Sequence, residues 1–396
     1  MKILICGPVN PLELVDFLNK GQDVPKVNLT AMAVNTYVKE LLRQGHTVKV
    51  VTSFIPGWEK DVILHGDRLT IHIVHSNPGI FIFHGFSRLY MIPRLKKAIG
   101  LYVKDCDVIH AQWTYDFAYA AKSFSSVIPV FCTVRDWCPY ILSLQHGFRK
   151  CQWYIYIYIF RKVFASDQIH FIANSDYTYN SIINAYPQKK VSVIYNPIDK
   201  VLITDQKVNI LDRPVFISIS GSVFEERKNI LKLLEAFKLF RETHDNSILK
   251  IVGDYDGLSD EKRKDFQNKG LLQHVVFCGK LSHNELMHEI DNSSCLVHPS
   301  IEETFGNILI EGMARRVLVI GGIDAGAVPF VLDNGNCGIL CDVKNVYAIK
   351  DAMERSLNKE LYNSIVNKAT EMINVKFRSD SVVLQHIKLF ASYISC

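Results

Sequence analysis

Short apolar runs alternate with helix-like segments along the first half of the chain, and this alternation limits the folds available to it. The runs are rich in Val and Ile, as expected for strands that helices cover on both faces. Residues 30–44 form a helix-like segment with Val34, Val38 and Leu41 on one face, and Gly45 ends it. This pattern predicts an α/β fold with a parallel, doubly wound sheet. The candidate strands are residues 2–6, 47–52, 107–111, 129–134, 169–174 and 191–195.

The same alternation restarts after a polar stretch from Asn196 to Pro214, which we interpret as a linker. A helix at residues 229–242 shows Ile230, Leu233, Leu234 and Phe237 on one face. The candidate strands of this half are residues 215–220, 249–252, 275–278, 295–298, 317–320 and 338–341. Two Rossmann-like domains facing a cleft are therefore expected, and ligands of such sheets bind outside the carboxyl ends of the strands. The expected domains are residues 1–200 and 201–378, with a C-terminal helix at residues 379–396 packing back on the first.

Composition excludes several classes of protein. The chain has 396 residues, enough for two domains with their own cores, and its formal charge of +5 indicates no nucleic-acid partner. Ten cysteines are scattered without a Cys-x-x-Cys pair, which favours reduced thiols in a cytoplasmic protein over disulfides or a zinc site. No apolar segment is long enough to cross a bilayer, and the first residues are typical of a strand rather than a signal peptide.

The segment from Ser300 to Ala314 carries the strongest chemical signal. Glu303 and Glu311 flank a Phe-Gly-Asn turn, and a helix is expected to begin at Gly306 and Asn307. A helix N-terminus beside a loop carboxylate can hold a phosphate and a hydroxylated ring together, which suits a nucleotide sugar. The alternative is a solvated loop glutamate followed by a glutamate on a helix surface.

An ordered set of short motifs surrounds this segment. They are Ile172-Ala-Asn-Ser175, Tyr195-Asn-Pro-Ile-Asp199, Gly221-Ser-Val-Phe-Glu-Glu-Arg-Lys-Asn229, Ile251-Val-Gly253, Val276-Phe-Cys-Gly279, Pro299-Ser300, Gly326-Ala-Val-Pro329, Asp333-Asn-Gly335 and Gly338-Ile-Leu340. With these motifs the chain resembles the group 1 family of retaining GT-B glycosyltransferases, which move a sugar from a nucleotide donor. The first half matches more loosely, through residues 45–48 and 107–110.

The resemblance implies roles for the two glutamates and the helix start. Glu303 would bind hydroxyls of the donor sugar, and Glu311 would bind the ribose hydroxyls. The backbone N–H groups of Gly306, Asn307 and Ile308 would meet phosphate or sugar oxygens. Carboxylates suit sugar hydroxyls because each oxygen accepts strong hydrogen bonds.

The resemblance also implies how the leaving diphosphate is stabilised. Lys228, helped by Arg227, would neutralise the charge that develops on it, so Lys228, Glu303 and Arg227 are the expected catalytic residues. Gly221 and Ser222 would line the donor site, although relatives often carry Arg where this chain has Ser222, and one extra residue precedes Lys228. No metal and no other cofactor is expected. The alternative for Lys228 is a solvated lysine at a helix start.

Three residues of the first half are candidates for an acceptor or phosphate site. Arg135 and Asp136 follow a strand where relatives place His before Asp, and Arg135 could bind a diphosphate or an acidic acceptor. His110 lies near the carboxyl end of another strand and either faces the cleft or is a core histidine. The loop from Gly7 to Asn28 replaces the usual glycine-rich turn and is expected to line the acceptor side.

Other patterns have simpler interpretations. Asp105-Cys-Asp107 and Asp254-Tyr-Asp256 fit the short Asp-x-Asp motif of a different glycosyltransferase fold, but the GT-B interpretation needs no metal. Three further histidines show no metal-ligand spacing and are expected to be structural: His283, His288 and His298. Aromatic and basic residues at 149–162, together with 81–97, either contact an anionic membrane surface or form a buried aromatic element capped by solvated charges.

The sequence thus predicts a retaining hexosyltransferase that moves a sugar from a nucleoside-diphosphate donor to a glycan or lipid-linked acceptor. We expect it in bacterial surface polysaccharide biosynthesis, in the cytoplasm or at the inner face of the cell membrane. The alternatives are a GT-B nucleotide-sugar epimerase and a catalytically silent sugar-binding subunit. The base, the sugar, the linkage, the acceptor and the oligomeric state stay open.

Overall fold

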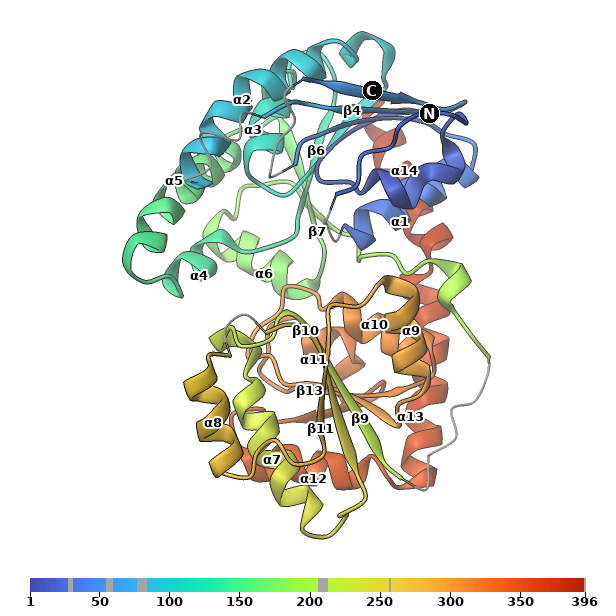
Figure 1. Cartoon of the computed structure of the whole chain (residues 1–396). Coiled ribbons are helices and arrows are strands. Elements are labelled where there is room, and N and C mark those ends of the chain that lie inside the picture. Colours follow the sequence, from blue (N-terminus) through green and yellow to red (C-terminus); the bar gives the residue numbers. More distant parts are fainter. Residues whose placement is uncertain (28–30, 55–59, 77–83, 206–212, 256–257, 395–396) are drawn as a thin grey trace. The chain divides into compact units, whose positions relative to one another are not determined.

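Two α/β units make up the structure, a computed structural model that describes residues 1–27, 31–54, 60–76, 84–205, 213–255 and 258–394. Unit 1 consists of Met1–Pro197 and Ser379–Cys396, and unit 2 of Ile198–Arg378 (Figure 1). Each contains one sheet covered by helices, as the alternating pattern predicts. The predicted polar linker includes residues 206–212, and the predicted first helix includes Thr30; these positions lie outside the described residues.

Eight strands form the sheet of unit 1 in the order β3-β4-β2-β1-β5-β6-β7-β8. The strands are β1 (Lys2–Cys6), β2 (Thr47–Thr52), β3 (Val62–His65), β4 (Leu69–Ile73), β5 (Val108–Gln112), β6 (Val130–Val134), β7 (Ile169–Ala173) and β8 (Val191–Val193). The predicted parallel, doubly wound sheet is confirmed: neighbouring strands pair in parallel, with one antiparallel pair, β3 and β4, at the edge. The sequence prediction missed both strands; β3 is a short edge strand with exposed residues at alternate positions, which weakens its apolar pattern.

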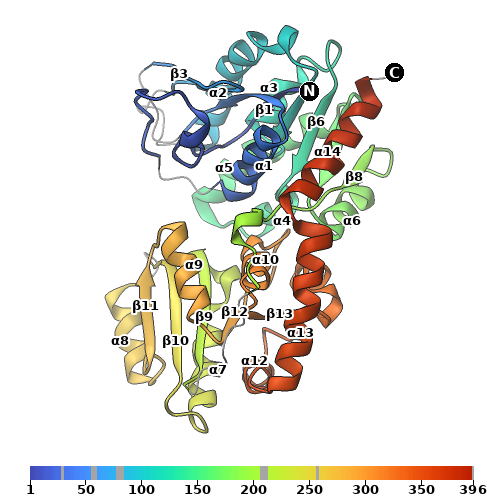
Figure 2. The same ribbon diagram turned by 90° about the vertical axis from the view of Figure 1, so that its right-hand side faces the viewer.

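Both faces of this sheet are buried. Ile3 and Ile5 of β1 join one apolar cluster, whereas Leu4 and Cys6 join another on the opposite face. The covering helices are α1 (Met32–Arg43), α2 (His84–Gly100), α3 (Asp116–Lys122), α4 (Cys138–Ser143), α5 (Gly147–Phe164), α6 (Asp176–Ala185) and α14 (Ser379–Ile394), with 3₁₀ turns η1 (Pro11–Phe17) and η3 (Val103–Asp105). The C-terminal helix α14 lies against α1 (Figure 2), where Ser379 Oγ donates to the buried Glu40 Oε2 at 3.1 Å.

Six parallel strands form the sheet of unit 2 in the order β11-β10-β9-β12-β13-β14. They are β9 (Val215–Ser222), β10 (Ile248–Asp254), β11 (Val275–Gly279), β12 (Cys295–His298), β13 (Leu318–Gly322) and β14 (Ile339–Cys341). The helices are α7 (Ile230–Arg241), α8 (Asp260–Asn268), α9 (His283–Asp291), α10 (Asn307–Ala314), α11 (Val328–Val331), α12 (Val346–Arg355) and α13 (Lys359–Met372). The shorter turns are η4 (Lys200–Leu202), η5 (Glu226–Lys228), η6 (Asp333–Gly335) and a π-helical turn, η7 (Ile373–Phe377).

The strand order of unit 2 reverses between β9 and β12. The chain runs outward from β9 through β10 to β11 and then returns to β12, which pairs with β9 on its other side. Loops that leave the carboxyl ends of two such strands diverge to opposite faces and leave a crevice that ligands commonly occupy. The loops after β9 and β12 therefore define the place in unit 2 to look for a site. Within the described residues, no helix is both long and apolar enough to span a membrane.

Candidate functional site

The loop between β9 and α7 is fastened to the loop that follows β12. Asn229 adopts a left-handed conformation with φ of 56°, and its side-chain Nδ2 donates to the carbonyl oxygens of Pro299 at 3.1 Å and Val343 at 2.7 Å. The backbone N–H of Ile301 donates to the Arg227 carbonyl at 2.9 Å. These bonds place the side chain of Lys228 beside the loop that carries Glu303.

Glu303 is held from its other side by the loop after β13. Ala327 N–H donates to the Glu303 carbonyl at 2.7 Å, and Glu303 and Gly326 form an isolated parallel bridge. Gly326 has a φ of +63°, and a Cβ added there would lie 2.4 Å from the Glu303 carbonyl oxygen. Only glycine fits so close an approach in that conformation. The predicted Gly326-Ala-Val-Pro329 motif thus fixes the backbone of Glu303.

Three nitrogen-bearing side chains converge on one oxygen of Glu303. Lys228 Nζ donates to Glu303 Oε1 at 2.5 Å, His298 Nε2 lies 3.2 Å from the same oxygen, and an Arg227 guanidinium nitrogen lies 4.0 Å away. Burial by itself would raise the pKa of Glu303, but His298 and Lys228 outweigh it and hold that pKa well below its usual value. Glu303 is therefore a fixed anion at neutral pH, and Lys228 is not the solvated lysine of the alternative interpretation, since its side chain is 11% exposed.

Arg227 lies at the edge of this group. Its Nε donates to Glu225 Oε1 at 2.7 Å, so the guanidinium interacts with two carboxylates, those of Glu225 and Glu303. Burial lowers the pKa of Arg227, but Glu225 and Glu303 more than offset this and raise it overall. Arg227 and Lys228 together place two positive charges next to the Glu303 loop.

The helix α10 begins at the predicted residues. Gly306 is its N-cap with a φ of 83°, and Asn307 and Ile308 open the first turn. Backbone N–H groups at a helix start have no partner within the helix, so they present positive partial charge at the β9–β12 crevice. Leu309 N–H closes the turn onto the Gly306 carbonyl at 3.0 Å.

Glu311 lies in the second turn of α10 and is 4% exposed, which excludes the helix-surface alternative. Within the described part of the chain, its carboxyl group makes no hydrogen bond or ion pair. Burial raises the pKa of Glu311 to about 8. A buried carboxyl without a partner is costly unless something outside the protein satisfies it.

The end of β9 is open to solvent. Gly221 and Ser222 are both exposed, and a Cβ added to Gly221 would meet no atom of the described residues within 4 Å. The neighbouring β10 approaches closely, because Gly253 has a φ of +137° and a Cβ there would lie 1.7 Å from the Ser220 carbonyl oxygen. Asp254 forms an ion pair with Lys280, and Asp256 lies outside the described residues.

In unit 1, Arg135 follows β6 and is oriented by two neutral side chains. Its Nε donates to Gln112 Oε1 at 2.8 Å, and a terminal nitrogen donates to Asn196 Oδ1 at 2.7 Å. Burial lowers the pKa of Arg135 to about 10, so the guanidinium stays charged at neutral pH. Asp136, its neighbour, accepts a hydrogen bond from the Tyr115 hydroxyl at 3.0 Å.

His110 is a core histidine, so of the two alternatives that the sequence leaves open the structure favours the buried one over the acceptor side. Its side chain is fully buried, with Nδ1 3.2 Å from the Tyr37 hydroxyl and Nε2 2.7 Å from Thr133 Oγ1. Burial, followed by nearby His386 and Arg135, lowers the pKa of His110 well below its ordinary value. The ring is therefore neutral, and both of its nitrogens lie within hydrogen-bond distance of protein hydroxyl groups.

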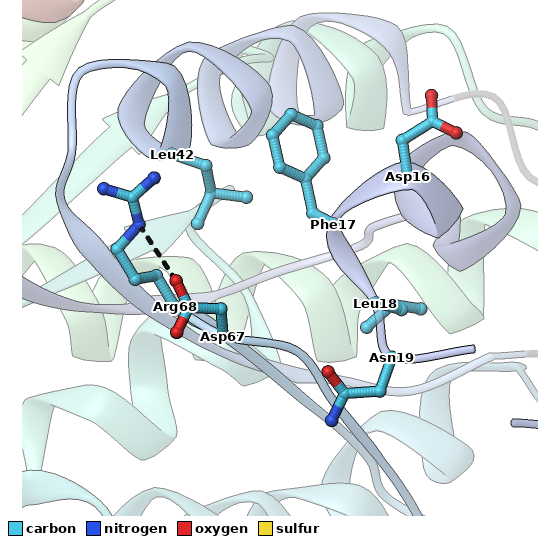
Figure 3. Close-up of a pocket in the computed structure, with 7 residues that line it drawn as sticks. All are labelled: Asp16, Phe17, Leu18, Asn19, Leu42, Asp67 and Arg68. Carbon is cyan, nitrogen blue, oxygen red and sulfur yellow. Dashed lines mark ion pairs between the residues drawn. The ribbon is translucent and has the colours of Figure 1, made fainter.

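The loop after β1 also departs from expectation over most of its described length. It begins at the carboxyl edge of the sheet, where Asn35 Oδ1 accepts from Asn10 N–H, but then follows α1 toward the opposite edge. There it lines a cavity of about 230 Å³ between η1, α1 and the β3–β4 turn (Figure 3). The lining residues are Asp16, Phe17, Leu18, Asn19, Leu42, Asp67 and Arg68. Asn28 itself lies outside the described residues.

The remaining acidic pattern, Asp105-Cys-Asp107, is structural. Lys49 Nζ donates to Asp105 Oδ2 at 3.1 Å, and Lys2 N–H donates to Asp107 Oδ2 at 2.7 Å. Both carboxylates lie where β5 begins, at the edge opposite the strands' carboxyl ends. No group of three His, Cys, Asp or Glu side chains in the described ranges is placed to hold a metal ion.

Two residues of the site were not predicted. His298 was expected to be structural, yet it contacts Glu303; its position at the carboxyl end of β12 was the available signal. Asn229 was assigned only as a helix start, although its place directly after Lys228 could have suggested an anchor. Their partners are distant in the sequence, so neither contact follows from local spacing.

Comparison with known proteins shows that both halves of the sequence match models of glycosyltransferase families. Residues 31–201 match the model "Glycosyltransferase Family 4", and residues 203–372 match "Glycosyl transferases group 1". An N-acetyl-alpha-D-glucosaminyl L-malate synthase from Bacillus anthracis is 26% identical over 211 residues, 52% of this chain and 54% of that protein. A lipopolysaccharide 1,2-N-acetylglucosaminetransferase from Salmonella typhimurium is 25% identical over 184 residues, 45% of this chain and 48% of that protein. The matches span about half the length of each relative.

Solved structures share the fold along the whole chain. A sucrose-phosphate synthase from Thermosynechococcus elongatus has a TM-score of 0.78 at 17% identity and covers 100% of both chains. The Anabaena protein HepE in complex with UDP-glucose has a TM-score of 0.68 at 16% identity, covering 99% of this chain and 100% of that one. With a Family 4 domain followed by a group 1 domain on this fold, the chain is a glycosyltransferase of the GT-B type.

Proposed function

We propose that this glycosyltransferase moves a sugar, with retention of its anomeric configuration, from a nucleoside-diphosphate donor bound in unit 2. The observation that carries the proposal is the group of Lys228, Arg227 and Glu303 at the start of α10. Glu311, which has no partner among the described residues, lies one turn further along the helix. Positive charge, helix-end N–H groups and two carboxyl groups match a diphosphate joined to a ribose and a second sugar.

Lys228 and Arg227 would act at the moment when negative charge develops on the leaving diphosphate. The leaving diphosphate gains negative charge as the bond to the sugar breaks, and fixed positive groups stabilise that state more than the ground state. Lys228 and Arg227, with the N–H groups of Gly306, Asn307 and Ile308, supply this charge. Stabilisation of the leaving group by these residues requires neither a metal ion nor an enzyme nucleophile.

Two contacts would fix the ligand's orientation. Glu311 would accept hydrogen bonds from the ribose hydroxyls, which would satisfy its buried carboxyl group. Glu303 would accept from hydroxyls of the transferred sugar. Gly221 and Ser222, exposed at the end of β9, would leave room for the nucleotide to approach the backbone.

We take UDP as the nucleotide to test first. The neighbour HepE was solved with UDP-glucose, and two relatives are named for N-acetylglucosamine transfer. The name of the lipopolysaccharide enzyme also supports a bacterial surface glycan, free or lipid-linked, as the acceptor. We assign acceptor recognition to unit 1, where Arg135 and Asp136 follow β6 and the charged guanidinium suits an acidic group.

We also propose that unit 1 contacts an anionic membrane surface through α5. One face of this helix is buried through Ile157, Phe160 and Phe164, so the segment is partly the buried element of the alternative interpretation. Tyr154 and Tyr158, 56% and 53% exposed, continue toward the exposed Arg161 and Lys162 on the opposite face. Interfacial tyrosines beside basic side chains suit lipid headgroups.

A co-sedimentation experiment with vesicles tests this contact. Wild type should sediment with phosphatidylglycerol-containing vesicles and be released by salt. The double variant Tyr154→Ser/Tyr158→Ser should stay in the supernatant while retaining its UDP response. Equal sedimentation of both proteins would remove α5 from the proposal.

The nucleotide assignment is tested by thermal shifts with UDP, GDP, ADP and CDP. A ligand at about a hundred times its Kd stabilises the folded state by about 2.7 kcal/mol. Wild type should respond to one nucleotide, then release it from the matching sugar conjugate, and NMR of the transferred sugar should show retention. No response to any nucleotide would overturn the donor assignment. Sugar interconversion without an acceptor would instead indicate an epimerase.

A further inference from the structure

One oxygen of the Glu303 carboxylate is occupied by the protein, and the other is not. Lys228 and His298 both lie against Oε1, at 2.5 and 3.2 Å. No side chain or backbone group in the described ranges donates a hydrogen bond to Oε2. The carboxylate is thus anchored at one oxygen and presents the other.

His298 is built into the sheet. It is the last residue of β12, pairs with Gly321 of β13 and is 3% exposed. Its Nε2 lies within hydrogen-bond distance of Glu303 Oε1 but is not aligned with it, and this buried nitrogen has no other partner among the described residues. Buried N–H groups are almost always satisfied, so an unaligned one beside a carboxylate points to a second arrangement.

Lys228 is the group that can leave this arrangement. Its ammonium sits on a flexible four-carbon stem, whereas the imidazole of His298 is confined by the strand. A bound diphosphate carries more negative charge than one carboxylate and competes for the same ammonium. When Lys228 turns to the diphosphate, Glu303 loses its shorter contact.

We propose that His298 is a positioning residue that holds Glu303 once a nucleotide sugar has drawn Lys228 to its diphosphate. In that state Nε2–H donates to Oε1 in place of the ammonium, and Oε2 accepts from a hydroxyl of the transferred sugar. The inference rests on the proposed function and adds a division of labour: Lys228 serves the diphosphate, and His298 keeps the carboxylate aimed at the sugar.

The test compares two variants at position 298 using UDP and UDP-glucose. His298→Gln keeps a donor near the Nε2 position, whereas His298→Leu removes it at similar volume. UDP affinity should be unchanged in both. The rate of UDP release from UDP-glucose should fall about ten- to a hundredfold in His298→Leu, since small misplacements of reacting groups cost that much. His298→Gln should retain most of the rate, and His288→Leu, at an exposed histidine of α9, should behave as wild type.

The outcomes separate this inference from the proposed function. If wild type binds none of UDP, GDP, ADP and CDP, the proposed function itself fails. If wild type is active and His298→Leu is equally fast, or if His298→Gln is as slow as His298→Leu, the positioning role is overturned. Loss of UDP affinity together with turnover would make His298 merely structural.

A spectroscopic measurement on wild type does not depend on how the variants fold. In protein labelled with ¹⁵N-histidine, the Nε2 resonance of His298 should move when UDP-glucose is added, because the ring gains an aligned acceptor. UDP alone, which also draws Lys228, should move it in the same direction, and Lys228→Met should show the shifted resonance without ligand. An unmoved resonance in the presence of saturating UDP-glucose would overturn the proposal.

Discussion

Glu303 and Glu311 lie eight positions apart on one loop and helix, yet their surroundings are opposite. Glu303 is buried against Lys228 and His298, which outweigh burial and lower its pKa. Glu311 is buried without a partner among the described residues, and its pKa is raised to about 8. The comparison shows that spacing between two carboxyl groups says little about their charge. The protein compensates Glu303 with its own side chains, whereas Glu311 has no compensating group among the described residues.

The two shifts have opposite consequences for stability against pH. Because the folded-state pKa of Glu303 is lowered, its contribution is present above its unfolded-state pKa and is lost as pH falls through the folded-state pKa. Because the folded-state pKa of Glu311 is raised, its contribution is present below about 4.5 and is lost as pH rises to about 8. Near neutral pH the free protein holds Glu303 ionised and Glu311 mostly protonated.

The largest expected effect comes from removing the ion pair between Lys228 and Glu303. Lys228→Met leaves Glu303 buried without its nearest cation and also removes charge from the proposed diphosphate site. We expect turnover of UDP-glucose to fall about 10²- to 10³-fold, and unfolding in urea to show a loss of about 3 kcal/mol. The double variant Lys228→Met/Glu303→Gln should recover most of the stability and none of the activity. Recovered activity would contradict the role given to Lys228.

The second expected effect comes from replacing Glu311, the glutamate without a partner among the described residues, by a side chain that is neutral at every pH. Glu311→Gln removes the titrating group, so its stability relative to wild type should rise between pH 5 and pH 8, by up to about 1.4 kcal/mol for each unit of the pKa shift. The same variant should lose the stabilisation by UDP, which is about 2.7 kcal/mol in wild type at a hundred times Kd. Thermal melts at both pH values, with and without UDP, measure this. A full UDP response in Glu311→Gln would separate this residue from the nucleotide.

Local pattern was sufficient for most of the fold. Short, largely buried apolar runs were predicted at the observed bounds for β1, β2 and β12, because such runs depend little on distant contacts. The edge strand β3 was missed because an exposed edge mixes polar and apolar residues. The start of α10 was predicted because Gly306 marks a helix boundary whatever surrounds it.

The site was less predictable because its charges depend on contacts between distant segments. Lys228 lies beside Glu303 because Asn229 holds the loop after β9 against the loop after β12, and Gly326 allows the loop after β13 to pack against Glu303. Local spacing in the sequence does not reveal these contacts. The choice between the two alternatives for His110 stayed open for the same reason: its partners Tyr37 and Thr133 come from other elements and lie against both ring nitrogens. Residue type indicated the chemistry, whereas burial and partners decided which groups could perform it.

A smaller effect is expected from moving Glu303 without changing its charge. Gly326→Ala adds a Cβ that would lie 2.4 Å from the Glu303 carbonyl oxygen, so the loop must shift. Gly270→Ala is the matched control, because Gly270 has a similar φ of +67° but its nearest neighbour is 3.9 Å away. We expect Gly326→Ala to be about 2 kcal/mol less stable than Gly270→Ala and to turn over UDP-glucose about tenfold more slowly. Equal stabilities would mean that backbone strain, not the contact with Glu303, sets the requirement for glycine.

The smallest expected effect is that of removing metal ions. Glu303 already holds Lys228 at one oxygen, and Glu311 is mostly protonated at neutral pH, which makes it a poor metal ligand. UDP release from UDP-glucose should therefore keep its rate after EDTA treatment, and Asp254→Asn, at the Asp-x-Asp pattern, should behave as wild type. A rate that falls with EDTA and returns with Mg²⁺ or Mn²⁺ would assign part of the diphosphate charge to a metal. In that case the contrast between the two glutamates would describe the free protein but not the reacting complex.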